Sequence, residues 1–336
     1  MDIEEGGDTP ETEDRAFRLL SDFSGTPEGW CQVFLRIRTK KATAISLSWN
    51  HAQQRLNNVV ADLQASGKPI RVTVLKARQE GVSTWAAARA FERSCRGSNY
   101  NALVVAHKGE SSAELFDMAR FFLNSLPFKP KTDFSNRREI VFSDPINSKI
   151  RIESAENRDA ARGQTNQFVH CSEVAFWRNP EETMLGVLQT VPDTPEAWVV
   201  FESTANGVGG YFYDAYWQAK NGESEFIAVF LPWWSHPEYD FDCSQEDYDR
   251  ILATITPEEQ EGIAKFHWEP GQLAWRRWAI ANKCNGDLHR FKQEYPATEH
   301  EAFITSGAPA FDVDNLRALS EAKPREVLRG RLVANV

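Results

Sequence analysis

The segment from Lys76 to Thr84 combines basic residues, a glycine and two hydroxyls in the order of a phosphate-binding loop. A β-branched run at 71–75 precedes it and an alanine-rich run at 85–95 follows it, which predicts a strand, a short loop and a helix. The N–H groups at the start of such a helix, together with the helix dipole, hold anionic oxygens. The segment therefore predicts a binding site for a phosphate group.

The loop departs from the common pattern G-x-x-x-x-G-K-[ST] at two positions. The first glycine is absent and Val82 stands where the lysine would be, although Gly81 and the hydroxyl pair Ser83–Thr84 remain. A cation is needed to neutralise the phosphates as charge develops during phosphoryl transfer. Two residues could supply it, Lys76 at the entrance of the loop and Arg78 inside it.

Two later strand-like runs end in polar residues that fit nucleotide hydrolysis. The run at 167–172 ends in Ser172 and is followed by Glu173, and the run at 197–202 is followed by the polar segment 203–207. A carboxylate beside a phosphate loop orients the attacking water. Polar groups at the carboxyl end of a central strand can sense the γ-phosphate, because ligands bind at that edge of open α/β sheets. Glu173 is the one acidic residue of the Ser172–Glu173 pair, and it is the predicted catalytic carboxylate.

Strand-like runs alternate with helical stretches along most of the chain. The predicted strands are 71–76, 102–107, 148–153, 167–172, 197–203 and 226–232. This alternation predicts an α/β fold with a mostly parallel sheet and helices on both faces. The runs 138–142 and 150–152 resemble an inserted hairpin, and 49–63 has helical spacing of its apolar residues. Beyond about residue 235 the sequence turns helical and rich in tryptophan, with a helix start expected at 257–260.

Composition is that of an ordinary globular protein, with 41% apolar and 26% charged residues in 336. The net charge of −10 argues against a protein coated for DNA binding, although seven acids fall between Asp2 and Asp14. No apolar run approaches the ~20 residues of a membrane span, and the acidic N-terminus does not read as a signal peptide. The five cysteines are widely scattered, which favours buried reduced thiols in a cytoplasmic protein.

Several segments, in order, resemble the large terminase subunit of tailed bacteriophages, the ATPase that packages DNA into preformed heads. They are 75–84, 161–164, 170–177, 202–207, 294–298 and 301–307, within a resemblance that spans roughly residues 45 to 312. The resemblance implies a phosphate-loop ATPase of the additional-strand catalytic-glutamate type, with ATP and Mg²⁺ as cofactors. It implies that ATP hydrolysis drives translocation of double-stranded viral DNA into a procapsid. The expected partners are double-stranded DNA, a portal protein and a small terminase subunit. A homo-oligomeric ring would form on the portal, in the host bacterial cytoplasm and with no membrane.

The resemblance also assigns catalytic roles to particular residues. It favours Lys76 as the cation, since some terminases carry the loop lysine at the front of the loop, and Arg78 resembles the arginine that the family has inside the loop. Glu173 is the catalytic glutamate. Arg162 is a candidate arginine finger that would reach a neighbouring subunit, with Arg158 as its rival and a simple loop arginine nearly as good a reading.

Further residues are expected to bind the nucleotide and its metal ion. The predicted cofactor-binding residues are Gln79, Gly81, Val82, Ser83 and Thr84 in the loop, Asn50 and Gln53 in the adenine-side motif, and Ser203 and Thr204 in the coupling motif. Ser83 and Ser172 are the expected metal-binding hydroxyls, and Ser83 could equally cap the helix. His170 is read as a core histidine rather than a catalytic one.

The expected organisation is an acidic disordered tail at 1–14, an ATPase domain at 15–312 with a helical C-terminal subregion from about 235, and the start of a linker at 313–336. Large terminases continue into a nuclease domain, of which the sequence shows no sign, so no DNA cleavage is expected from this chain. Two other functions stay open. One is a different nucleic-acid remodelling ATPase, which would need a second motor domain. The other is a non-hydrolysing structural or adaptor relative, which an ATPase assay would distinguish.

Overall fold

The computed structural model describes residues 25–127, 130–136, 138–157 and 163–303. The predicted acidic tail and the predicted linker at 313–336 lie outside these ranges. None of the helices that the structure describes is long and apolar enough to cross a membrane.

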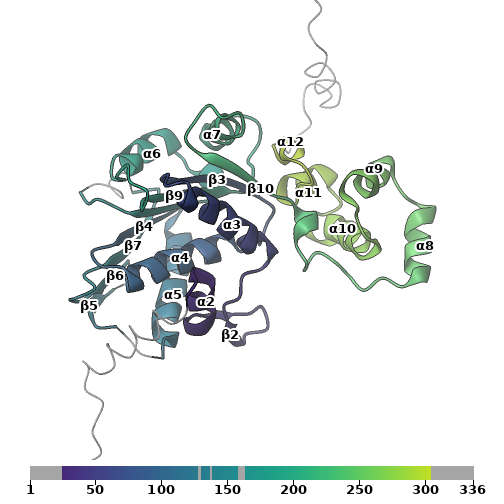
Figure 1. The fold of residues 1–336 in the computed structure, drawn as a ribbon. Helices are drawn as coiled ribbons and strands as arrows, with labels where there is room; N and C mark the ends of the chain where they lie inside the picture. Colours follow the sequence, from purple (N-terminus) through teal and green to yellow (C-terminus); the bar gives the residue numbers. More distant parts are fainter. Residues whose placement is uncertain (1–24, 128–129, 137, 158–162, 304–336) are drawn as a thin grey trace, which may run out of the picture.

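An eight-stranded sheet forms the centre of the fold, in the order β10-β3-β9-β8-β4-β7-β6-β5 (Figure 1). The strands are β3 (Ile70–Lys76), β4 (Asn101–Ala106), β5 (Thr132–Ser135), β6 (Glu139–Phe142), β7 (Lys149–Ser154), β8 (Phe168–Ser172), β9 (Trp198–Ser203) and β10 (Ile227–Leu231). All pairs from β10 to β7 are parallel, and β6 and β5 are antiparallel. The prediction of a mostly parallel sheet is therefore confirmed. β9 lies between the loop strand β3 and β8, which is the additional strand of the expected ATPase type.

The predicted hairpin is present, but it is the end of the main sheet rather than a separate insertion. β7 pairs in parallel with β4 on one side and antiparallel with β6 on the other. The edge strand β5 extends this end of the sheet and was not predicted. A second, two-stranded sheet of β1 (Arg36–Arg38) and β2 (Ala44–Ser46) was also missed.

Helices cover both faces of the sheet, as predicted. On one face lie α2 (Pro27–Phe34), α3 (His51–Ala65), α4 (Val82–Arg96) and α5 (Gly109–Ser125), and on the other lie α6 (Pro180–Leu188) and α7 (Tyr211–Lys220) (Figure 1). Side chains alternate between the faces, so Ala102 and Val104 of β4 join the core under α4 and α5. Leu103 and Val105 join the opposite core under α6 and α7. Both faces are apolar, which explains why the strands read as continuous apolar runs.

The C-terminal part forms a helical subregion with its own aromatic core. It contains α8 (Gln245–Ala253), α9 (Pro257–Phe266), α10 (Pro270–Lys283), α11 (Leu288–Glu294) and α12 (Glu299–Ala302), and short 3₁₀ turns lie at Val174–Phe176 and Trp233–Ser235. The predicted start of α9 is confirmed, with Thr256 and Glu259 forming a capping box. Trp233 stacks on Trp275 in the centre of this subregion, and Ala77 of the predicted loop belongs to the same core. The phosphate loop therefore packs directly against the C-terminal helices.

Candidate nucleotide-binding site

The predicted loop connects β3 to α4 at the carboxyl edge of the sheet. Gln79 and Gly81 both adopt left-handed backbone conformations, with φ of 57° and 77°. A Cβ on Gly81 would lie 2.7 Å from the Gln53 side chain, so this position requires glycine for both conformation and space. Gly81 is the N-cap of α4 and supplies no side-chain cap, and Val82 is buried in the core. The first N–H groups of α4 therefore have no capping side chain and suit an anionic ligand.

Asn50 and Gln53 hold this loop rather than standing free beside it. They form a reciprocal capping box at the start of α3, in which each side chain accepts from the other residue's backbone N–H. Their amide nitrogens donate to the loop backbone, from Asn50 to the Glu80 carbonyl at 3.1 Å and from Gln53 to the Gly81 carbonyl at 2.8 Å. Their contact with adenine stays a prediction, and these side chains would have to give up existing bonds to make it.

Lys76 lies at the centre of the site. Its side chain is 7% exposed, and its Nζ lies 3.0 Å from Oε1 of Glu173 and 3.1 Å from Oε2 of Glu202. The parallel register brings these residues together, because Leu75 pairs with Ser203 and Ser172 pairs with Glu202. Burial alone would lower the pKa of Lys76, but the two carboxylates outweigh it and raise that pKa above its usual value. The structure thus places a permanent cation at the loop entrance.

Glu202 is the residue that sequence reasoning missed. It is fully buried, and its Oε1 accepts hydrogen bonds from the hydroxyls of Ser83 and Ser172, both at 2.7 Å. His170 Nε2 lies 3.3 Å from the same oxygen, which confirms His170 as a buried core residue. Burial would raise the pKa of Glu202, but Lys76, His170 and Ser172 together hold it well below its usual range. Its sequence signal was a carboxylate at the end of an otherwise apolar strand.

Glu173 occupies a strained position next to this cluster. It has a left-handed backbone with φ of 55°, between β8 and a 3₁₀ turn. Such conformations cost free energy in residues other than glycine and gather at functional sites. Its Oε2 lies 3.4 Å from both the Ser203 hydroxyl and the Thr204 N–H, so the residues predicted to sense the γ-phosphate contact the predicted catalytic carboxylate.

Arg78 points to a different part of the molecule. Its guanidinium forms an ion pair with Glu294 of α11, and its backbone N–H donates to the Glu294 carbonyl at 2.9 Å. The Tyr239 hydroxyl donates to the Arg78 carbonyl. Its catalytic role stays a prediction, while its contacts join the loop to the C-terminal helices. Arg158 and Arg162 lie outside the described residues.

Glu80 is a second buried acid that the sequence did not single out. Neither of its carboxylate oxygens has a hydrogen-bond partner among the described residues, and its side chain is fully buried. Burial raises the pKa of Glu80 from 4.5 to about 9; Lys76 opposes this rise and Glu238 adds to it. Glu80 is therefore protonated and neutral at pH 7.

The donors at the site fit a hard cation such as Mg²⁺. Within the described residues no group of three or more His, Cys, Asp or Glu side chains is arranged to hold a metal. The oxygen donors that converge here are the hydroxyls of Ser83 and Ser172 and the carboxylates of Glu173 and Glu202. Mg²⁺ usually binds through one or two protein oxygens, substrate phosphates and water. This set therefore suits a magnesium ion delivered with a nucleotide.

Comparison with solved structures identifies the fold, and no protein-family model matches the chain. The large terminase of bacteriophage HK97 is similar with a TM-score of 0.54 and 15% identity, covering 83% of this chain and 55% of that chain. The ATPase domain of the Thermus phage P74-26 large terminase matches at 0.40 and 19% identity, covering 59% of this chain and 89% of that domain. The large terminase of a thermophilic bacteriophage, solved in complex with ADP, matches at 0.42 and 13% identity, covering 62% of this chain and 50% of that chain.

The similarity to the HK97 protein shows that this chain has the fold of a phage large terminase ATPase domain. The chain spans about half the length of that protein.

Proposed function

We propose that this chain binds and hydrolyses ATP, and that hydrolysis drives translocation of double-stranded viral DNA into a procapsid. One observation carries the proposal. A buried lysine at the mouth of a phosphate loop bridges two carboxylates, and two serines predicted to bind metal converge on one of them. The terminase-like fold supports the same reading.

In the proposed reaction the α4 N-terminus and Lys76 hold the phosphates of ATP. Mg²⁺, when bound with ATP near the hydroxyls of Ser83 and Ser172, would neutralise charge on the phosphates. Glu202 keeps those hydroxyls oriented by accepting a hydrogen bond from each. Glu173 accepts the proton of the attacking water, so that a P–O bond forms to the water oxygen as the bond to ADP breaks.

The Lys76 contacts account for the order of these events. Without nucleotide the Lys76 ammonium is paired with Glu173, which keeps this carboxylate from acting as a base. A γ-phosphate would compete for the same ammonium and would free Glu173 for water. Hydrolysis in the absence of a correctly bound substrate is thereby disfavoured.

Coupling to DNA would involve partners of the kind the family resemblance suggests. We infer a homo-oligomeric ring on a portal protein, with a small terminase subunit delivering DNA in the host cytoplasm. The link from the loop to α11 through Arg78 and Glu294 offers a path by which nucleotide binding would move the C-terminal helices. The net charge of −10 suits a motor that holds DNA only transiently, because each phosphate contact slows release.

Phosphate release from ATP by purified chain, with and without Mg²⁺, tests the enzymatic part. Glu173→Gln keeps the shape of the side chain but cannot take a proton, so turnover should fall by ~10²–10⁴ while ATP still binds. Glu181→Gln, an exposed glutamate on α6, is the matched control and should retain full turnover. Unchanged turnover in Glu173→Gln would remove it from the mechanism.

Translocation is tested separately by adding portal-bearing procapsids and linear DNA and measuring DNA protected from nuclease. Protection should require ATP and disappear with Glu173→Gln. ATP hydrolysis without protection would leave the chain as an ATPase of another kind.

A further inference from the structure

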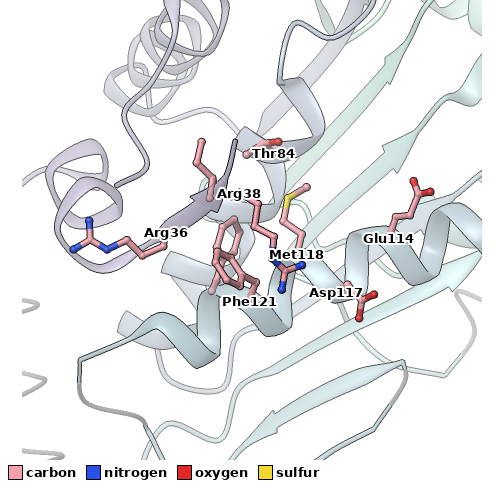
Figure 2. Close-up of a pocket in the computed structure, with 9 residues that line it drawn as sticks. Arg36, Arg38, Thr84, Glu114, Asp117, Met118 and Phe121 are labelled. Carbon is pink, nitrogen blue, oxygen red and sulfur yellow. The ribbon is translucent and has the colours of Figure 1, made fainter. Parts of the chain in front are cut away.

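A cavity of about 370 Å³ lies beside the first turn of α4, on the side away from Asn50 and Gln53 (Figure 2). Its lining comes from three elements: β1, the first turn of α4, and the middle of α5. Its size lies in the range of small-molecule sites. Neither the residues of the expected adenine motif nor the carboxylates of the catalytic cluster line it.

The position of the cavity relates it to the nucleotide. Thr84 lines it and is the third residue of α4, directly after Ser83, whose hydroxyl belongs to the metal cluster. The phosphates proposed to bind at the α4 N-terminus would thus end next to this cavity. The sugar and base of the same nucleotide have to continue from that point.

The chemistry of the lining suits a flat heterocycle. The Arg38 guanidinium lies 4.4 Å from the centre of the Phe121 ring, and Figure 2 shows this pair close to Met118, beneath Thr84. Aromatic rings and guanidinium planes are surfaces on which bases stack. Arg36 is committed elsewhere, because its guanidinium donates to the Ser46 hydroxyl on β2 and points away from the other labelled side chains.

Two carboxylates complete the lining on the α5 side. Glu114 and Asp117 lie one helical turn apart and are both exposed. A carboxylate only accepts hydrogen bonds, so it matches the exocyclic amino group of a purine. The combination of a stacking pair, an apolar side chain and acceptors is a base-recognition chemistry rather than a phosphate-recognition one.

We propose that this cavity between β1 and α5 holds the purine base of the bound nucleotide, with the base stacked at Arg38 and Phe121. The proposal rests on the proposed function, since it assumes that the phosphates sit at the α4 N-terminus. It differs from the expectation for Asn50 and Gln53, whose amides are engaged in holding the loop.

The test compares a ligand that has a base with one that lacks it. Calorimetry with Mg²⁺ measures the dissociation constants of ADP and of pyrophosphate for the wild-type chain and for variants. Arg38→Ala removes half of the stacking pair, and ADP binding should weaken on the order of 10-fold or more. Pyrophosphate affinity should change less than about 2-fold relative to the control, because the phosphate site is untouched.

The matched control is Arg120→Ala, which removes the same charge from an exposed position on α5 that does not line the cavity. It corrects for the general loss of attraction between the chain and an anion. Met118→Trp provides a second variant that fills the cavity, and it too should weaken ADP and leave pyrophosphate binding intact. Retained pyrophosphate binding also shows that each variant is folded.

Two results would overturn the inference, and they differ in what else they remove. ADP affinity that is unchanged in both Arg38→Ala and Met118→Trp, with normal wild-type binding, would place the base elsewhere and leave the ATPase proposal standing. A wild-type chain that binds neither ADP nor pyrophosphate would remove the proposed function together with this site.

Discussion

Replacing Glu80 by glutamine should stabilise the protein, and by more at higher pH. Glu80 lies in the phosphate loop, fully buried and without a hydrogen-bond partner for its carboxylate oxygens. Its pKa rises from 4.5 to about 9, chiefly because burial disfavours the charged form. Glu80→Gln keeps the shape of the neutral side chain and removes its dependence on a proton.

The size of the effect follows from the two pKa values. Between pH 4.5 and about 9 the folded chain binds a proton at Glu80 that the unfolded chain has largely released. The free energy of unfolding therefore falls as pH rises through this window. One pH unit is worth about 1.4 kcal/mol, so the proton costs roughly 3 kcal/mol at pH 7 and less than about 1 kcal/mol at pH 5.

Urea unfolding of wild type and Glu80→Gln at pH 5, 6, 7 and 8 measures the difference directly. The variant should gain stability by an amount that grows with pH. Glu223→Gln, an exposed glutamate in the turn after α7, should show no such trend. A stability difference between wild type and Glu80→Gln that is constant with pH would refute the reasoning that Glu80 is protonated in the folded loop.

Three other perturbations test the rest of the site. Lys76→Ala should weaken ATP binding or abolish turnover, whereas full activity in it and inactivity in Arg78→Ala would move the loop cation to Arg78. Gly81→Ala should lower stability by about 1–3 kcal/mol and weaken nucleotide binding, seen in urea unfolding and calorimetry, because φ is +77° and a Cβ would meet a neighbouring amide. If Arg162 acts across a subunit interface, activity per chain should rise with concentration, and mixing Arg162→Ala with Glu173→Gln chains should restore part of the turnover. A flat concentration dependence without complementation would confine Arg162 to its own subunit or exclude it.

The central sheet was readable because its strands are apolar on both faces. Each of the six predicted strands matches an observed strand to within one residue at either end. The elements that were missed are short and lie at edges: β1 and β2 have three residues each, and β5 has four. Such strands carry too few residues for a periodic pattern. Their pairing depends on what the rest of the chain places beside them.

The site was partly readable for a topological reason. Parallel strands end at one edge, so Lys76 and Glu173 could be expected together before their contact was known. Glu202 and Glu80 could not be assigned in the same way. A carboxylate at a strand end or in a loop reads the same in sequence whether it is solvated or buried. The packing of β8 against β9 and of the loop against the C-terminal helices decides which it is.

The two buried acids place opposite demands on the same lysine. Glu202 is ionised because Lys76 and three hydrogen-bonding side chains compensate its burial, whereas Glu80, which has no such partners, stays neutral. Lys76 therefore has two negative neighbours rather than three, Glu173 and Glu202, and the nucleotide-free site carries a net charge of about −1. A nucleotide that draws Lys76 away from Glu173 leaves that carboxylate held only by Ser203 and Thr204 among the described contacts. These two residues begin the segment that connects β9 to α7, so in the proposed motor a change at the γ-phosphate would reach that segment through Glu173.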